Sequence, residues 1–130
     1  MLEFTVLGSG SGGNAFVVRT PCGSTVMVDA GLSAKQLALR LEAVGVSPDA
    51  LSAIILTHEH GDHTRGLDVF LRKRSIPVYS NSHTARVVAD GMKSAVDWKL
   101  VQTGGEFCIG GLGIESFSIP HDAVDPLGLV

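Results

Sequence analysis

The feature that most constrains the fold is an apolar run that ends directly in a cluster of histidines and carboxylates. The run covers residues 52–57 and contains β-branched side chains. Short runs of this kind are typical of a strand that other elements cover on both faces. From the last residue of the run onward the sequence reads Thr57-His58-Glu59-His60-Gly61-Asp62-His63. Polar groups beside a buried strand carry a desolvation cost unless they bind something, so the sequence predicts a binding site at this strand end.

The spacing of the cluster favours a metal site. His58 and His60 are two residues apart, so in an extended segment both imidazoles point to the same side. Gly61 allows a sharp turn, after which Asp62 and His63 would open a helix beside the first pair. Imidazole and carboxylate are the usual ligands of Zn²⁺ and similar ions, and such ligands also tolerate Mn²⁺ or Fe²⁺. Four ligands exceed what one ion needs if a water position stays open, so we expect two divalent ions.

The hydrophobic period predicts a mixed sheet with helices packed on a face. Residues 2–6, 15–19 and 25–29 are expected to form an antiparallel meander. Ser33 and Gln36 have the form of a capping box, and Gly45 stands where the same helix is expected to end. A second helix is expected over residues 63–74 and a third over 82–90. The remaining predicted strands cover residues 52–57, 77–79, 98–101, 106–109 and 114–119.

Composition excludes several classes of protein. The chain has 130 residues, of which 45% are hydrophobic and 18% charged, which fits one folded domain and excludes a disordered protein. No apolar run approaches the length of about 18 residues that crosses a bilayer, and the N-terminus lacks the basic region of a signal peptide. The two cysteines, Cys22 and Cys108, make no disulfide scaffold. We therefore expect a cytoplasmic protein with reduced thiols and no contact with membranes.

The end of the sequence carries a further expectation. Leu127-Gly128-Leu129-Val130 is apolar and has the pattern of a strand just beginning, whereas natural termini are usually polar and frayed. We expect residues 1–130 to be the N-terminal portion of a single domain that continues beyond Val130.

Three motifs resemble those of a known family. His58-x-His60-x-Asp62-His63 after an apolar strand resembles the signature motif of the metallo-β-lactamase superfamily. Val28-Asp29-Ala30-Gly31 resembles its earlier motif, in which an aspartate closes a strand before glycine. The lone His121 after a later strand resembles its third motif. Residues 8–14, together with His121-Asp122-Ala123 and Asp125-Pro126, are most similar to the YycJ-like subgroup of bacterial proteins.

The resemblance implies a fold and a set of ligands. The fold would be an αββα sandwich of two similar halves, with this chain forming about the first half and the metals lying at one edge between the sheets. His58, His60 and His121 would hold one metal, while Asp62 and His63 would contribute to the second. The last two ligands of the family pattern would lie beyond Val130.

The expected roles follow from metal chemistry. A bound ion lowers the pKa of its water toward about 7, so a metal-bound hydroxide would attack the substrate. Asp62 would orient this nucleophile or take its proton, and Asp29 would hydrogen-bond a ligand or the backbone beside the site. Glu59 is expected to point away from the ligands and His83 to lie on the surface. The glycine-rich loop over residues 8–13 is expected to line the site as a tight connection.

Charge alone leaves the substrate open. The formal net charge of −3 argues against a nucleic-acid binder that uses its whole surface. Between Arg65 and Lys99, however, the sequence contains seven basic residues and only three acidic ones. With the family resemblance, we expect a phosphodiesterase or DNA exonuclease with nucleic acid as substrate. Salt-dependent affinity for oligonucleotides would favour this hypothesis.

Two alternatives remain. The first is a small-molecule hydrolase, similar to glyoxalase II, that acts on a thioester or lactone. The second is a catalytically inactive half-domain that binds metal weakly and associates with a partner, for which a homo-oligomer is one option, through an exposed sheet edge or face. Hydrolysis of a thioester without affinity for oligonucleotides would favour the first, and a monomeric chain in size-exclusion chromatography would count against the second.

Overall fold

The computed structural model describes residues 3–10, 12–21, 23–72, 74–102, 104–109, 112–118 and 127–129. Its strands are β1 (Glu3–Gly8), β2 (Ala15–Arg19), β3 (Thr25–Val28), β4 (Ala53–Ile55), β5 (Val78–Ser80), β6 (Trp98–Leu100), β7 (Glu106–Ile109), β8 (Leu112–Ser118) and β9 (Leu127–Leu129). Its helices are α1 (Ala34–Ala43), α2 (Gly61–Thr64), α3 (Leu67–Leu71) and α4 (Ser82–Asp90), with a 3₁₀ turn, η1 (Pro48–Ala50). Within this part of the chain, no helix has the length and apolar character needed to span a bilayer.

The strands form two sheets. The larger sheet has the order β1-β2-β3-β4-β5-β6, and the smaller one has the order β7-β8-β9. β1, β2 and β3 pair antiparallel, which confirms the expected meander. From β3 to β6 the neighbours pair in parallel, so the carboxyl ends of β4 and β5 lie at the same edge of the sheet.

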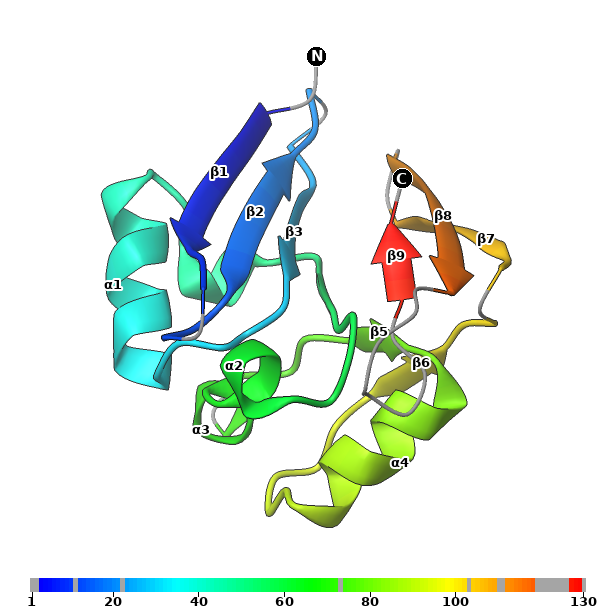
Figure 1. Cartoon of the computed structure of the whole chain (residues 1–130). Helices are drawn as coiled ribbons and strands as arrows, with labels where there is room; N and C mark the ends of the chain where they lie inside the picture. Colours follow the sequence, from blue (N-terminus) through cyan, green and yellow to red (C-terminus); the bar gives the residue numbers. More distant parts are fainter. Residues whose placement is uncertain are drawn as a thin grey trace.

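Both faces of the central strands of the larger sheet are covered (Figure 1). One face packs against the helices, where Leu37, Leu41 and Phe70 bury themselves over Met27 and Ile54. The other face packs against the smaller sheet through a separate core of β3, β4, β7 and β8 side chains. The described layers are therefore helix, sheet and sheet, and the expected mixed sheet with helices on a face is confirmed.

The burial of the central strands is explained by their apolar sequence. Parallel strands covered on both faces are nearly continuous apolar runs, and every residue of β3 and β4 is buried. Because successive side chains alternate, Met27 enters the core beneath the helices while Val26 and Val28 enter the core between the sheets. The polar residues after β4 are thus the first that can reach solvent.

Helix α1 begins and ends where its sequence predicts. The side chain of Ser33 accepts a hydrogen bond from the Gln36 amide at 3.3 Å. At the other end, the Gly45 amide donates to Glu42 at 3.0 Å and the Val46 amide to Leu41 at 2.9 Å. These two bonds form a Schellman motif, which satisfies the last carbonyls of the helix.

The prediction of one continuous helix over residues 63–74 is wrong. The segment is divided into α2 and α3, because the Gly66 amide donates to the carbonyl of Ala30 at 2.8 Å instead of continuing the helical ladder. A Cβ atom at Gly66 would lie 2.0 Å from the Leu32 carbonyl oxygen, so only glycine permits this approach. The interruption ties α2 to the turn after β3, a tertiary contact that helical periodicity does not reveal.

The expected strand over residues 25–29 is one residue too long. It ends at Val28, since Asp29 has a φ of 64° in the left-handed region. For an L-residue this conformation is uncommon, and aspartate and asparagine tolerate it better than most. The strand end therefore turns sharply at the residue that the sequence singles out.

Candidate metal centre

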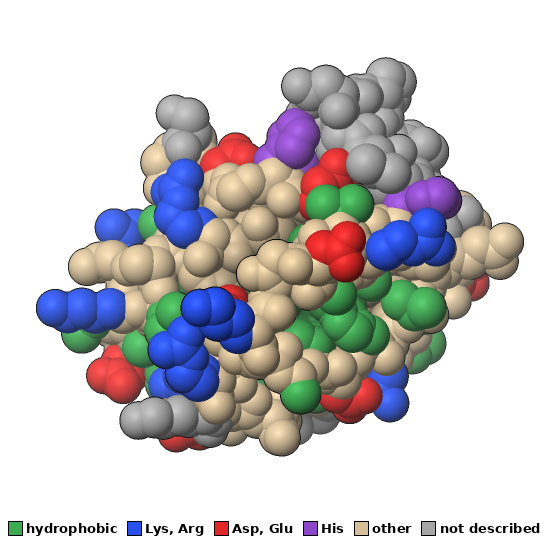
Figure 2. Space-filling model, turned by 90° about the horizontal axis from the view of Figure 1, so that it is seen from below, with side chains coloured by type: hydrophobic (Ala, Val, Ile, Leu, Met, Phe, Trp, Pro, Cys, Tyr) green, Lys and Arg blue, Asp and Glu red, His purple; other side chains and the backbone are tan. Residues whose placement is uncertain are grey.

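Three of the expected ligands converge at the carboxyl end of β4. His58 follows the strand, while Asp62 and His63 lie in the first turn of α2. Each of the three offers one ligand atom, and these atoms all lie within 4.8 Å of one another. All three side chains are partly exposed, and Figure 2 shows histidine side chains at the surface with acidic side chains beside them.

His60 lies next to this cluster. Its ring centroid is 5.3 Å from that of His58 in an edge-on arrangement, whereas the rings of His58 and His63 are 3.6 Å apart. The remaining expected ligand, His121, and its neighbour Asp122 lie outside the described residues.

The side chain of Asp29 contacts the cluster from its buried side. The residue is 4% exposed, and its carboxylate accepts the Thr57 amide at 2.8 Å and the Thr57 hydroxyl at 2.7 Å. The Nδ1 atom of His63 lies 2.6 Å from the same carboxylate. Asp29 therefore contacts both Thr57, which follows β4, and one of the candidate ligands.

This network fixes how the two rings are protonated. A carboxylate only accepts, so His63 carries its proton on Nδ1 and Thr57 donates its hydroxyl proton to Asp29. The Thr57 oxygen then accepts from the Nδ1 atom of His58, which lies 3.0 Å away. In both rings the lone pair is left on Nε2, and that atom of His63 lies 3.6 Å from a carboxylate oxygen of Asp62. The donor set thus fits a divalent cation.

The electrostatics of His63 reflect its acidic neighbours. Burial lowers the pKa of its imidazole, but the hydrogen bond and charge of Asp29, with the charge of Asp62, outweigh burial and raise the pKa above its usual value of 6.5. The same negative potential that attracts a proton here also attracts a metal cation.

Two residues of the centre were not expected from the sequence. Thr57 connects Asp29 to His58, and Asn14 reaches Asp62 from the loop before β2, with its Nδ2 atom 3.1 Å from a carboxylate oxygen. Their places in the sequence are the only signals that could have identified them: Thr57 stands directly before the histidine motif, and Asn14 directly after a glycine-rich turn. The glycine-rich loop, which was expected to line the site, contacts α2 and its C-terminal end through Asn14 and Gly12.

The other singled-out side chains lie away from the cluster. Glu59 lines a pocket of about 230 Å³ with Val87 and Met92, on the side facing α4. His83 is exposed at the start of α4, as expected. Cys108 is an exposed free thiol, whereas Cys22 lies outside the described residues.

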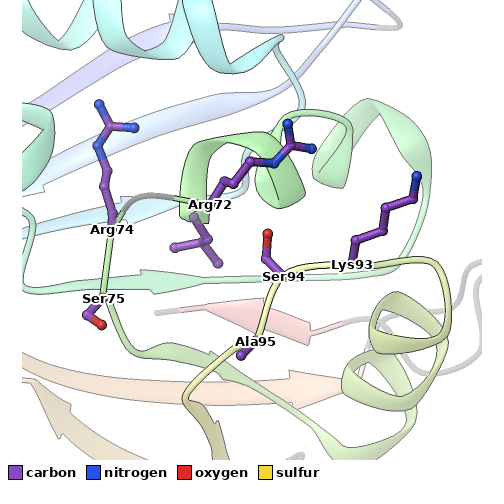
Figure 3. A pocket seen from close by; sticks show the side chains of 7 residues that line it. Arg72, Arg74, Ser75, Lys93, Ser94 and Ala95 are labelled. Carbon is purple, nitrogen blue, oxygen red and sulfur yellow. The ribbon is translucent and has the colours of Figure 1, made fainter.

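Among the described basic residues between Arg65 and Lys99, Arg65 lies apart from Arg72, Arg74 and Lys93. Arg65 lies beside the cluster, where it donates to the Gly12 carbonyl at 3.2 Å. Arg72, Arg74 and Lys93 extend to one side of a separate pocket of about 870 Å³ (Figure 3). The residues of that pocket come just before β5 and β6, whereas the cluster comes just after β4. Because these strands are parallel, the pocket lies at the amino ends of the strands and the cluster at their carboxyl ends. The guanidinium of Arg74 is also paired with Asp49 at 2.8 Å.

Comparisons with known proteins agree with this geometry. Residues 8–128 match the family described as the metallo-beta-lactamase superfamily. The chain is 35% identical to the exodeoxyribonuclease WalJ of Streptococcus pneumoniae, over 95% of this chain and 47% of the relative. It is 37% identical to the exodeoxyribonuclease YycJ of Bacillus anthracis, over 97% of this chain and 48% of the relative.

A solved structure extends the comparison to the fold. The Rm3 metallo-beta-lactamase matches with a TM-score of 0.82 at 23% identity, covering 97% of this chain and 52% of that one. At this identity the match supports the fold alone. The chain spans about half the length of the curated relatives that it matches.

Proposed function

This chain belongs to the metallo-beta-lactamase superfamily, and from that premise we propose that the protein is a metal-dependent hydrolase that degrades DNA as an exonuclease. The observation that carries the proposal is the convergence of His58, Asp62 and His63 above the buried carboxylate of Asp29. The two relatives named as exodeoxyribonucleases supply the substrate class.

The proposed centre holds two divalent ions, with Zn²⁺ as the expected metal. His58, His60 and His121 are assigned to one ion, and Asp62 and His63 to the other. The mixed imidazole and carboxylate donors suit Zn²⁺, and the ligand atoms of His58, Asp62 and His63 lie within 4.8 Å of one another, which supports a single metal centre for these residues. Divalent ions in such a centre would supply an ionised water at neutral pH and polarise the phosphoryl oxygen.

The chain itself would position the reacting groups. Asp29 fixes the ring of His63 through Nδ1, and Thr57 does the same for His58. Asp62 is 32% exposed in its side chain, so it can face both solvent and substrate. We assign it the task of orienting the attacking water and taking its proton.

We also propose that residues 1–130 form the N-terminal portion of a larger catalytic domain. The proposal is supported by the coverage of the relatives, which is 47% and 48% of their lengths. The activity of this chain alone is therefore expected to be lower than that of a protein with the full length of its relatives.

Metal content is the first test of the centre. We expect the purified chain to bind divalent metal by elemental analysis, and the variants His58→Ala and Asp62→Ala to lose bound metal because each removes one donor. In a protein that carries the whole domain, Asp62→Ala should reduce the degradation of linear DNA by about 10²–10⁴-fold, the usual effect of losing a general base. Asp49→Ala, an exposed carboxylate paired with Arg74, is the matched control.

Each outcome bears on one part of the proposal. Retention of all metal by both variants would refute the assigned ligands. Thioester hydrolysis without salt-dependent affinity for oligonucleotides would replace the nuclease with a small-molecule hydrolase. Metal binding without hydrolysis of either substrate would indicate that this chain is an inactive half-domain.

A further inference from the structure

Asn14 lies at the end of the glycine-rich loop, and its backbone is held between two other segments. Its amide donates to the Asp62 carbonyl at 2.7 Å, and its carbonyl accepts from the Gly31 amide at 2.9 Å. The residue therefore joins β2 to α2 and to the turn after β3. Both main-chain contacts hold the start of its side chain in one place beside the candidate metal centre.

The side-chain amide of Asn14 has one chemically consistent orientation. Its Oδ1 atom lies 3.0 Å from the Gly10 amide, which can only donate. Its Nδ2 atom lies 2.9 Å from the Gly10 carbonyl, 3.2 Å from the Asp62 carbonyl and 3.1 Å from the Asp62 carboxylate. These partners are acceptors, so the amide nitrogen must face Asp62 and the amide oxygen must face Gly10.

The close approach of Asn14 and Asp62 depends on glycine at position 31. A Cβ atom at Gly31 would lie 1.8 Å from the Asp62 carbonyl oxygen and 2.6 Å from the Asn14 amide nitrogen. Any side chain there would push α2 away from the loop. The contact is thus part of the packed structure and not a chance meeting of two surface groups.

From this geometry we infer that Asn14 is a positioning residue for the metal centre: its amide holds one carboxylate oxygen of Asp62 so that the carboxylate is oriented for the ion. The inference deepens the proposed function and rests on it. An N–H donor to a carboxylate makes a charge-assisted bond, which is stronger than a neutral one. The Nδ2 atom is also 3.4 Å from the Nε2 atom of His63, so the amide lies beside two candidate ligands at once.

The role differs from that of Asp29. Asp29 supports His63 from the buried side, through Nδ1. Asn14 contacts the opposite, more exposed side of the cluster, where Asp62 lies. Hydrogen-bond partners of metal ligands of this kind change metal affinity by about 10–100-fold when they are removed.

A titration with Co²⁺ tests the inference without any assay of activity. We expect Asn14→Ala to weaken the apparent Co²⁺ affinity of the chain by about 10–100-fold and to change the visible absorption of the bound ion, because the carboxylate loses its orientation. The main-chain bond from residue 14 to Asp62 stays in this variant. Ser9→Ala changes an exposed side chain of the same loop and should bind Co²⁺ as the unaltered chain does.

A double-mutant cycle separates positioning from a general effect on the loop. If Asn14 acts through Asp62, Asn14→Ala should have less than about a twofold effect on Co²⁺ affinity in a chain that already carries Asp62→Ala. An equal loss with and without the Asp62 carboxylate would overturn the inference, as would unchanged affinity in Asn14→Ala. Asn14→Ser can still accept the Gly10 amide, so it provides the same test if the alanine variant folds poorly.

The same titration distinguishes this inference from the proposed function. If the unaltered chain binds no Co²⁺, the metal centre itself is wrong and the role of Asn14 is refuted with it. If the unaltered chain binds Co²⁺ and His58→Ala weakens binding while Asn14→Ala does not, the centre stands and only the positioning role is refuted.

Discussion

At the scale of single residues, Asp29 has a strained backbone conformation and a buried carboxylate that makes three hydrogen bonds. Its φ of 64° costs an ordinary L-residue about 1–2 kcal/mol relative to the right-handed region. Its carboxylate nevertheless accepts from Thr57 twice and from His63 once. Strained residues of this kind cluster at functional sites, where the surrounding structure holds them in place. The left-handed backbone conformation of Asp29 accompanies the placement of its carboxylate against the ring of His63.

We expect Asp29→Asn to reduce the Zn²⁺ affinity of the chain by about 10–100-fold. Asparagine tolerates the left-handed conformation, so the backbone should be preserved. Its amide group cannot accept all three hydrogen bonds, and its –NH₂ group would oppose a donor. A competition titration with a chromophoric chelator measures the affinity. Asp49→Asn is the control, and equal Zn²⁺ affinity in both variants would contradict the role of Asp29.

At the scale of elements, a carboxylate of α3 fastens the loop between α4 and β6. Asp68 accepts the Ser94 amide at 2.9 Å and the Lys93 amide at 3.2 Å. Its own carbonyl accepts the Ser94 hydroxyl at 3.0 Å. The hydrogen bonds from Ser94 are the main cause of a lowered pKa of the Asp68 carboxyl, to which the Lys93 amide and the charge of Arg72 add. The ionised form is thus favoured in the folded chain.

This shift predicts a pH dependence of stability. A carboxyl whose pKa is lower in the folded chain stabilises the fold above its unfolded pKa of about 4, and that contribution is lost as the pH falls through the folded pKa. Asp68→Asn lacks this charge, so it should be less stable than the unaltered chain at pH 7. The difference should shrink as the pH falls toward 2. Urea unfolding across this range measures it, and a difference that is independent of pH would refute the charge effect.

At the scale of the whole molecule, the larger sheet is covered unevenly. The core between the two sheets draws its side chains mainly from β3, β4, β7 and β8. β1 is the terminal strand of the larger sheet, and its Phe4 and Val6 side chains are 66% and 68% exposed. Phe4 meets only the margin of this core, with its ring centroid 6.1 Å from that of Phe16. Among the described residues, this edge is therefore both apolar and unpaired along its outer side.

We expect the isolated chain to associate with itself through this edge, and Val6→Lys to shift it toward the monomer. Exposed edge strands pair readily with other chains, and a lysine on such an edge opposes the pairing. Analytical ultracentrifugation over a range of chain concentrations measures the change. Leu39→Lys replaces another exposed side chain, 51% exposed on α1, and should leave association unaltered. Monomeric behaviour of the unaltered chain at all concentrations would refute the prediction.

The sequence by itself determined the elements and the chemistry that depend on local order. The apolar run before His58 had to be a covered strand, and the spacing of His58, Asp62 and His63 placed their donors at its end. The caps of α1 followed from residues within a few positions of each other. Side-chain type and spacing act over short distances along the chain, so a motif can carry them.

Only the tertiary structure decided which distant groups complete the centre. Asn14 lies 48 positions before Asp62 and reaches it because glycine at position 31 allows the loop and α2 to approach. The division of the second helix at Gly66 likewise depends on a hydrogen bond to Ala30. The same folding separated Arg65 from Arg72 and Lys93, which charge along the sequence had grouped together. Such contacts depend on how the layers pack, and no short stretch of residues encodes that geometry.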